Sequence, residues 1–201
     1  MCDTYKTIKS PASGIYKEKG SRFLAFAFPV SHEGSIKDHL DELRKKYHNA
    51  RHFCYAWRLG PGKSNYRVND DGEPSGTGGK PIYGQIVSRD LTDALVVVVR
   101  YFGGTKLGVG GLINAYRSAA SDALDRSHII KCQVIDRLKL EFGYQQMNAV
   151  MKVIKDRQLD VEDQKFDLEC SLTLLSWTRN TELVLDTFSK ITGCRITLIE
   201  N

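Results

Sequence analysis

The segment Ala94–Tyr116 constrains the fold more than any other part of this 201-residue chain. It opens with a strand-length apolar run that contains four consecutive valines and no polar interruption. A short β-branched run of this kind is typical of a strand covered on both faces. Five glycines then surround Lys106, and apolar residues recur beyond them at helical spacing. We therefore expect a buried strand, a glycine-rich loop with one lysine, and a helix from Gly111 to about Arg126.

The glycine-rich loop is a candidate anion site. Glycine lets a backbone turn sharply and lets a ligand approach closely, and the following helix N-terminus offers unpaired N–H groups. A phosphate suits such a site best. The loop lacks the glycine order of the P-loop and of the dinucleotide-binding fingerprint, so a purely structural turn remains an equal alternative. The glycines expected to allow close backbone approach are Gly103, Gly104, Gly108 and Gly110.

The composition is that of an ordinary globular protein, with 41% hydrophobic residues. No apolar run approaches the roughly 20 residues that a membrane-spanning helix requires, and the first ten residues contain no apolar signal core. The five cysteines are widely spaced without a C-x-x-C pair, which argues against a disulfide framework and a zinc knuckle. We expect a cytoplasmic protein with no membrane contact, no bound metal and no cofactor.

The net charge of +5 is unevenly distributed. Residues 1–128 contain 19 Lys and Arg against 13 Asp and Glu, whereas residues 129–201 contain 10 against 11. A polyanionic partner would therefore contact the first part of the chain. A solvated surface explains a surplus of this size equally well.

The first 128 residues are expected to mix strands and helices. Periodicity predicts a hairpin of strands Gly14–Lys19 and Arg22–Pro29, a helix at Ile36–Tyr47, a strand at Arg51–Leu59 and a short helix around Ile82–Ser88. Between the last two lies Tyr66–Pro81, which is too rich in glycine and proline for regular structure. Long loops inside compact domains are often functional, so this segment is expected to be ordered and to form part of a site.

The pattern changes after about Ser127–Lys131, where we place a boundary between domains of residues 1–128 and 129–201. The order of elements in the second domain is β-α-β-β-α-β, which is the ferredoxin-like arrangement. Alternation in its strands predicts an antiparallel sheet with two helices on one face and an open second face. The expected strands are Cys132–Phe142, Leu159–Glu162, Phe166–Leu175 and Cys194–Ile199, and the expected helices are Tyr144–Arg157 and Leu183–Ile191.

The loop Tyr66–Pro81 carries three acidic side chains, Asp70, Asp71 and Glu73. Carboxylates of this kind act as acid or base groups or bind divalent metals, although D-D-G-E lacks the order of a calcium loop. Together with Lys106 they are the catalytic candidates, and an exposed acidic turn is the alternative. A nucleophile formed by Cys54 with His52, which lies two residues away on the same face of a strand, is also conceivable, but a core thiol is the commoner outcome.

Nucleic-acid binding has more support from the residues. Basic side chains surround the two glycine-containing loops and are interleaved along the chain with aromatic ones. The basic residues are Arg51, Arg58, Arg67, Lys80, Arg100, Lys106 and Arg117, and the aromatic residues are Tyr55, Trp57, Tyr66, Tyr101 and Phe102. Cations bind phosphates, and aromatic faces stack on bases. The cations expected to contact phosphate are Arg58, Lys80, Arg100 and Lys106.

Four motifs closely resemble the YigZ/IMPACT family, which comprises bacterial YigZ-like proteins and a domain of the eukaryotic IMPACT translation regulators. They all lie in the first domain, and the longer two are highly specific. The motifs are SRFLA at Ser21–Ala25, HFCYAWR at His52–Arg58, DDGEPSGTGGKPI at Asp70–Ile82 and VVVRYFGGTKLGVGGLINAY at Val97–Tyr116.

The resemblance implies an α+β protein of two domains. The first would be like the second domain of ribosomal protein S-five, and the second like the last domain of elongation factor G, which agrees with the ferredoxin-like order. It also implies an association with RNA or the ribosome, a role in translation regulation and, in eukaryotic relatives, protein partners. No settled enzymatic activity accompanies the family. Our leading hypothesis is a non-enzymatic RNA- or ribosome-associated protein, and the alternative is an enzyme acting on a phosphorylated small molecule. A third hypothesis is a protein-interaction module whose open sheet face in the second domain binds a protein partner.

Overall fold

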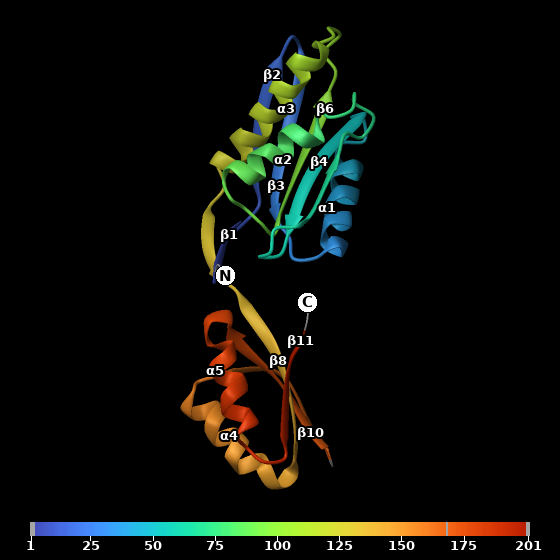
Figure 1. The fold of residues 1–201 in the computed structure, drawn as a ribbon. Coiled ribbons are helices and arrows are strands. Elements are labelled where there is room, and N and C mark those ends of the chain that lie inside the picture. The colour runs from blue at the N-terminus through green and yellow to red at the C-terminus, as the bar shows by residue number, and fades with distance from the viewer. Residues whose placement is uncertain (1–2, 168, 200–201) are drawn as a thin grey trace. The chain divides into compact units, whose positions relative to one another are not determined.

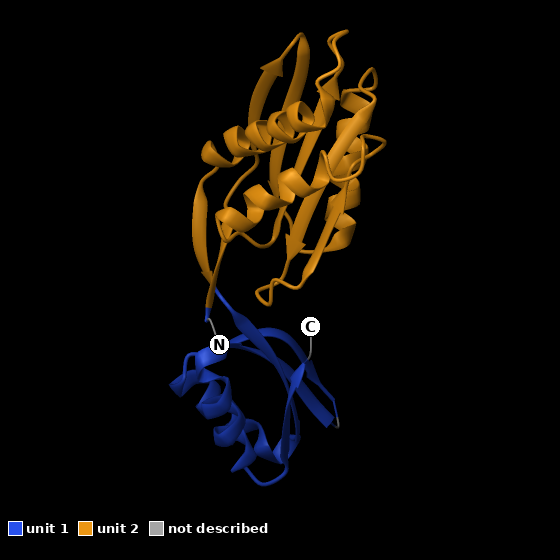
Figure 2. Ribbon diagram, turned by 45° about the horizontal axis from the view of Figure 1, so that its top comes forward, with its two compact units in different colours: residues 1–3, 133–201 blue, residues 4–132 orange. Residues whose placement is uncertain are grey.

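The computed structural model describes residues 3–167 and 169–199. The chain forms two compact units, one of residues 4–132 and one of residues 1–3 with 133–201 (Figure 2). Both units contain sheets and helices, which confirms the α+β class. Within the described residues, none of the helices combines the length and the apolar character of a membrane-spanning segment.

The unit of residues 4–132 is built on a five-stranded antiparallel sheet in the order β2-β3-β6-β4-β5. Helices α2 and α3 cover one face, and α1 covers the other (Figure 1). Two further strands, β1 and β7, pair with each other. The bounds are β1 Thr4–Ile8, β2 Ala12–Glu18, β3 Ser21–Pro29, α1 Glu33–Lys46, β4 His52–Leu59, β5 Asn65–Asn69, α2 Gly79–Ser88, β6 Ala94–Tyr101, α3 Gly108–Asp125 and β7 Ile129–Gln133.

Strand β6 is the centre of this sheet and contains the valine run. Val96 and Val98 pack with α2 and α3 in one core cluster, whereas Val97 and Val99 pack with α1 in another. Because successive strand residues point to opposite faces, an uninterrupted apolar run is what a strand between two helical layers requires. The prediction of a strand covered on both faces is confirmed.

The segment Tyr66–Pro81 is not wholly irregular, so that expectation was wrong in part. Its first residues belong to β5, which pairs with β4 through positions such as Tyr66 and Arg58. Strand β5 lies at the edge of the sheet, and its side chains are mostly exposed. An exposed edge strand is held by backbone hydrogen bonds to one neighbour and therefore needs no apolar alternation.

The second unit has a four-stranded antiparallel sheet in the order β11-β8-β10-β9 with helices α4 and α5. This order, with the sequence β-α-β-β-α-β, is the predicted ferredoxin-like arrangement. The expected strand Cys132–Phe142 is divided, because at Val134 the backbone instead bonds Asp3 and Thr178. The expected strand Phe166–Leu175 includes residue 168, which lies outside the described residues. The bounds are β8 Ile135–Gly143, the 3-10 turn Tyr144–Gln146, α4 Met147–Asp156, β9 Asp160–Phe166, β10 Glu169–Trp177, α5 Thr178–Ser189 and β11 Cys194–Ile199.

One face of this second sheet packs on the two helices, and the other is open, as predicted. Leu138 and Leu140 of β8 lie in the helix-facing core. The neighbouring open-face residues form ion pairs within the sheet, Arg137 with Glu162 at 2.7 Å and Lys139 with Glu141 at 2.6 Å. Arg137 and Lys139 are thus paired with the protein's own carboxylates.

Candidate functional site

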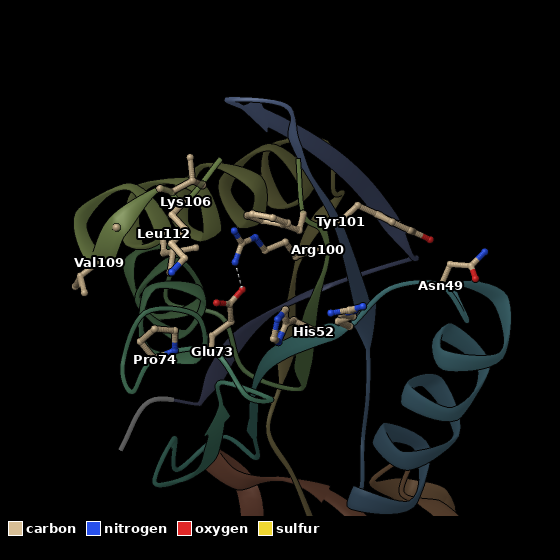
Figure 3. A pocket seen from close by; sticks show the side chains of 13 residues that line it. Asn49, His52, Glu73, Pro74, Arg100, Tyr101, Lys106, Val109 and Leu112 are labelled. Atoms are coloured by element: carbon tan, nitrogen blue, oxygen red, sulfur yellow. Dashed lines mark hydrogen bonds and ion pairs between the residues drawn. The ribbon is translucent and has the colours of Figure 1, made fainter. Parts of the chain in front are cut away.

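A cleft of about 740 Å³ opens in the unit of residues 4–132, at the end of the central strands. The ends of β4 and β6 meet there because His52 lies directly opposite Arg100 in the sheet. The loop that follows β5 contributes Glu73, and the loop between β6 and α3 contributes Lys106 (Figure 3). Three stretches that are separate in sequence, around His52, around Glu73 and from Arg100 to Leu112, therefore converge on one hollow.

Asp70 organises the acidic loop rather than the cleft. Its Oδ1 accepts hydrogen bonds from the backbone N–H groups of Gly78 and Gly79, and Oδ2 accepts one from Gly76, all at 2.8 Å. Burial works to raise the pKa of Asp70, but these three donors and the nearby Lys80 hold the pKa below its usual range. The carboxylate thereby satisfies the first N–H groups of α2 and keeps the loop closed.

Asp71 connects the same loop to the neighbouring elements. Its Oδ2 accepts a hydrogen bond of 2.7 Å from the backbone N–H of Phe53, and Arg44 of α1 lies 3.5 Å from Oδ1. Its carbonyl oxygen accepts a hydrogen bond of 2.9 Å from Nδ1 of His52. Because a carbonyl can only accept, this bond assigns the proton to Nδ1 and leaves Nε2 for other contacts.

Glu73 is the one member of the acidic trio that lines the cleft. Its side chain is 4% exposed, and Oε1 accepts hydrogen bonds from Nη1 of Arg100 at 2.6 Å and from the hydroxyl of Tyr116 at 2.8 Å. Burial first, and then the proximity of Cys54 and Glu73, raise the pKa of Tyr116. The hydroxyl therefore stays protonated and donates to the carboxylate.

Cys54 is an inert thiol in this arrangement. It is fully buried, and its Sγ donates to the carbonyl oxygen of Asp70 at 3.0 Å. Burial raises the pKa of the thiol, with further contributions of the same sign from the acidic loop. Since the thiolate is the nucleophile, these surroundings favour the interpretation as a core residue. Within residues 3–167 and 169–199, no three His, Cys, Asp or Glu side chains are grouped as metal ligands.

The four predicted phosphate-binding cations do not lie together. Arg100 and Lys106 line the cleft, whereas Arg58 is 6% exposed and pairs with Ala94 at the other end of β4. Arg58 lies six positions along β4 from His52, which corresponds to about 20 Å. Lys80 is exposed in the first turn of α2, beside Gly76.

The predicted glycines have different roles. Gly103 packs against the β2–β3 turn, where a Cβ atom would lie 1.9 Å from the carbonyl carbon of Gly20. Its close backbone approach is thus to the protein itself. Gly108 lines the cleft at the start of α3 with a φ of +72°, a conformation that favours glycine. Gly104 and Gly110 have open space around the position of a Cβ atom.

Four further residues line the hollow, Arg51 and His52 on one side and Phe102 and Val109 on the other. The sequence placed Arg51 and Phe102 among the basic and aromatic residues near the glycine-rich loops and considered His52 only as a partner of Cys54, and it gave no role to Val109. A usable signal was present on β4, because His52 continues the buried face formed by Cys54 and Ala56. When a polar residue follows two buried residues on the same face of a strand, it lies at the boundary between the core and solvent, where a cleft can form.

The comparisons with known proteins agree with this fold and these motifs. The model of the Impact N-terminal domain matches residues 19–124. The chain is 32% identical over 158 residues to the IMPACT family member YvyE of Bacillus subtilis, covering 79% of this chain and 73% of that protein. It is 39% identical over 145 residues to an IMPACT family member of Thermus thermophilus, covering 71% of this chain and 76% of the relative.

A solved structure described only as that of a hypothetical protein has the same fold. It superposes with a TM-score of 0.80 at 23% identity and covers 100% of both chains. The family model spans the glycine-rich loop, the acidic loop and the strands that form the cleft. On these grounds the chain belongs to the IMPACT family.

Proposed function

We propose that the unit of residues 4–132 binds single-stranded RNA, alone or as part of the ribosome, through the cleft and its rim. The observation that carries the proposal is the convergence of Arg51, Arg100 and Lys106 on one hollow beside the start of α3. Cations and free helix N–H groups are the common means of holding phosphate oxygens. The aromatic ring of Phe102 at the same place offers a surface on which a base can stack.

The second unit has an open sheet face, but the residues on that face are poorly suited to binding RNA. In RNA-binding domains with a four-stranded open sheet, aromatic side chains in the middle of the central strands stack on bases. Here the corresponding open-face positions of β8 and β10 include Lys139, Thr173 and Leu175. The cation Lys139 is already paired with Glu141. RNA contact is therefore assigned to the first unit, and the open face is left as a surface for a protein partner.

A role in translation regulation in the cytoplasm is part of the proposal. It rests on membership of the IMPACT family, which includes eukaryotic translation regulators, and on the excess of basic residues in the first part of the chain. In this role the protein acts by occupying RNA and performs no chemistry on it.

The test is the salt dependence of binding to a fluorescein-labelled single-stranded RNA of twelve nucleotides. If the two rim cations, Arg51 and Lys106, neutralise phosphates, log K should fall with log salt with a slope of about −1.4. The matched competitor is a double-stranded RNA of the same sequence, which should bind less tightly because its bases are not available for stacking. Absence of binding at low salt, or an affinity independent of salt, would rule out phosphate contact.

The alternative of an enzyme acting on a phosphorylated small molecule keeps one supporting observation. Glu73, His52 and Lys106 line a cleft whose volume is in the range of about 300–1,000 Å³ typical of small-ligand sites. Asp70 and Asp71 are occupied in holding the loop, so Glu73 is the carboxylate placed for chemistry. A panel of phosphorylated metabolites tests this, because a bound ligand must raise the melting temperature by mass action.

A further inference from the structure

The cleft has two chemically different zones. At its floor lie Arg100 and Glu73, whose side chains are 8% and 4% exposed. At its rim lie Arg51 and Lys106, which are both exposed. The wall between the zones is apolar and includes Phe102, which is 57% exposed. Figure 3 shows Arg100 and Glu73 joined by the dashed line that marks their ion pair, with Lys106 on the α3 side.

The floor keeps unused hydrogen-bonding capacity. Nη1 of Arg100 donates to Glu73, whereas Nη2 has no acceptor among the residues that the structure describes, and Nε is buried and also without one. On the other side of the pair, the two hydrogen bonds to Glu73 both end at Oε1, and neither uses Oε2. A guanidinium with spare donors therefore stands beside a carboxylate with a spare acceptor, and both line the cleft. Buried polar groups normally find partners, so this pair is suited to a ligand edge that accepts and donates side by side.

Electrostatics decides which end of a ligand reaches the floor. A phosphate placed there would lie against the Glu73 carboxylate at low dielectric, and like charges at close range repel strongly. At the rim a phosphate would meet Lys106 and the first N–H groups of α3 on one side, or Arg51 on the other, and Glu73 at the floor is the one carboxylate among the lining residues that the structure describes. The anion therefore belongs at the rim, and a neutral polar edge belongs at the floor.

We propose that the cleft holds one unstacked nucleotide, with the edge of its base on the Arg100–Glu73 pair, its ring against Phe102 and its phosphate at the Lys106 rim. Every nucleobase presents a donor next to an acceptor on its Watson–Crick edge, and arginine and carboxylate side chains are common readers of such edges. The inference deepens the proposed RNA function and rests on it, because it names the chemical unit that the same site takes. That unit is a nucleoside monophosphate, supplied either by an RNA strand or as a free nucleotide.

The experiment compares two strands with the same phosphates. Full-length protein is titrated with a twelve-nucleotide single-stranded RNA and with an oligomer of equal length in which all bases are replaced by abasic sites. Stacking of one base contributes enough that the RNA should bind roughly 5- to 150-fold more tightly. Equal affinities would overturn the base-insertion inference and leave phosphate binding intact. Absence of binding by both strands would overturn the proposed function and, with it, the strand as the source of the nucleotide.

A substitution at Phe102 tests whether the preference for RNA over the abasic oligomer arises at the apolar wall of the cleft. Phe102→Ala removes an exposed side chain and should abolish most of the preference for RNA over the abasic oligomer. Val87→Ala, which also removes an exposed apolar side chain but lies on α2 away from the cleft, should leave the preference unchanged. If Phe102→Ala weakens both strands equally, or Val87→Ala has the same effect, the nucleotide does not sit against this ring and the inference is wrong.

Experiments with free nucleotides distinguish whether the bound nucleotide comes from an RNA strand or is a free nucleotide. The four nucleoside 5′-monophosphates are tested as competitors of the RNA and as stabilisers of the protein in a thermal melt. Competition with the RNA supports one shared cleft. A nucleotide that stabilises wild-type protein but not Phe102→Ala, in the absence of any RNA binding, supports the cleft inference while it contradicts the RNA function. Stabilisation that Phe102→Ala retains in full would place the nucleotide elsewhere and overturn the inference.

Discussion

Arg100 and Glu73 form a buried ion pair in which Nη1 lies 2.6 Å from Oε1. The pair joins the central strand β6 to the loop that follows β5, 27 residues away in sequence. Tyr116 of α3 donates to the same carboxylate oxygen. One carboxylate thus links a strand, a loop and a helix at the floor of the cleft, which makes its removal a test of both stability and site geometry.

Breaking this pair from one side should be costly. Glu73→Ala leaves the Arg100 guanidinium buried without its counter-charge, and we expect a loss of about 3–5 kcal/mol in the free energy of unfolding. The double variant Arg100→Met with Glu73→Leu should lose clearly less than the sum of its two single variants, because neither charge is then stranded. Tyr116→Phe removes one neutral donor and should cost only about 1 kcal/mol.

Urea unfolding followed by the fluorescence of the buried Trp57, in a Trp177→Phe background, measures these values for the first unit. Additive losses in the double variant would show that the two side chains are not energetically coupled.

Asp70 should make the first unit sensitive to acid. Its pKa is lower in the folded protein than in the unfolded chain, so its contribution is fully present above the unfolded value of about 3.9 and is lost as the pH falls below it. Asp70→Asn removes the charge that accepts three backbone donors, and we expect a loss of about 1–3 kcal/mol at pH 7. The difference between wild type and variant should shrink between about pH 4 and pH 2.

The control for this experiment is Asp38→Asn, a change at an exposed position of α1. It should leave the unfolding free energy nearly unchanged at both ends of the pH range. A constant gap between wild type and Asp70→Asn from pH 7 to pH 2 would contradict the charge-based role of Asp70.

Two glycines of the same loop region should respond in opposite ways to alanine. At Gly103 a Cβ atom would collide with the backbone of the β2–β3 turn, so Gly103→Ala should destabilise the protein by about 2–3 kcal/mol. At Gly110, in the first turn of α3, no atom lies within 4 Å of the added carbon. Gly110→Ala should therefore stabilise the helix by about 0.5–1 kcal/mol. The melting temperatures of both variants measure these effects, and a lower melting temperature for Gly110→Ala would contradict the prediction.

Lys106 is expected to contribute one phosphate contact. Lys106→Ala should make the slope of log K against log salt less steep by about 0.7 for single-stranded RNA. Lys152→Ala changes the net charge equally but lies on α4 of the second unit, and it should leave the slope as in wild type. Fluorescence anisotropy at four salt concentrations provides both slopes. Equal effects of the two substitutions would indicate that binding follows the net charge and not this site.

Periodicity was sufficient for much of the fold. The valine run of β6 and the apolar spacing of α3 predicted buried elements because a core requires those side chains wherever the neighbours lie. The leucines of β8 and β10 likewise predicted a sheet with one open face. Strand β5 escaped prediction because its side chains are mostly exposed and its pairing depends on the backbone of β4. The domain boundary near Ser127–Lys131 remains a prediction, as does the role of each site residue.

The sequence by itself determined most of the apolar residues that form the core and the family to which the chain belongs, because hydrophobic spacing and long motifs are properties of the linear order. Only the tertiary structure decided which charges are available to a ligand. It used Asp70 and Asp71 to close a loop, separated Arg58 from Lys106, and placed Arg100 against Glu73 at the floor of a cleft. The physical reason is that strand register and loop closure set the distances between charges. Those distances determine whether a side chain meets solvent, a ligand or another part of the same protein.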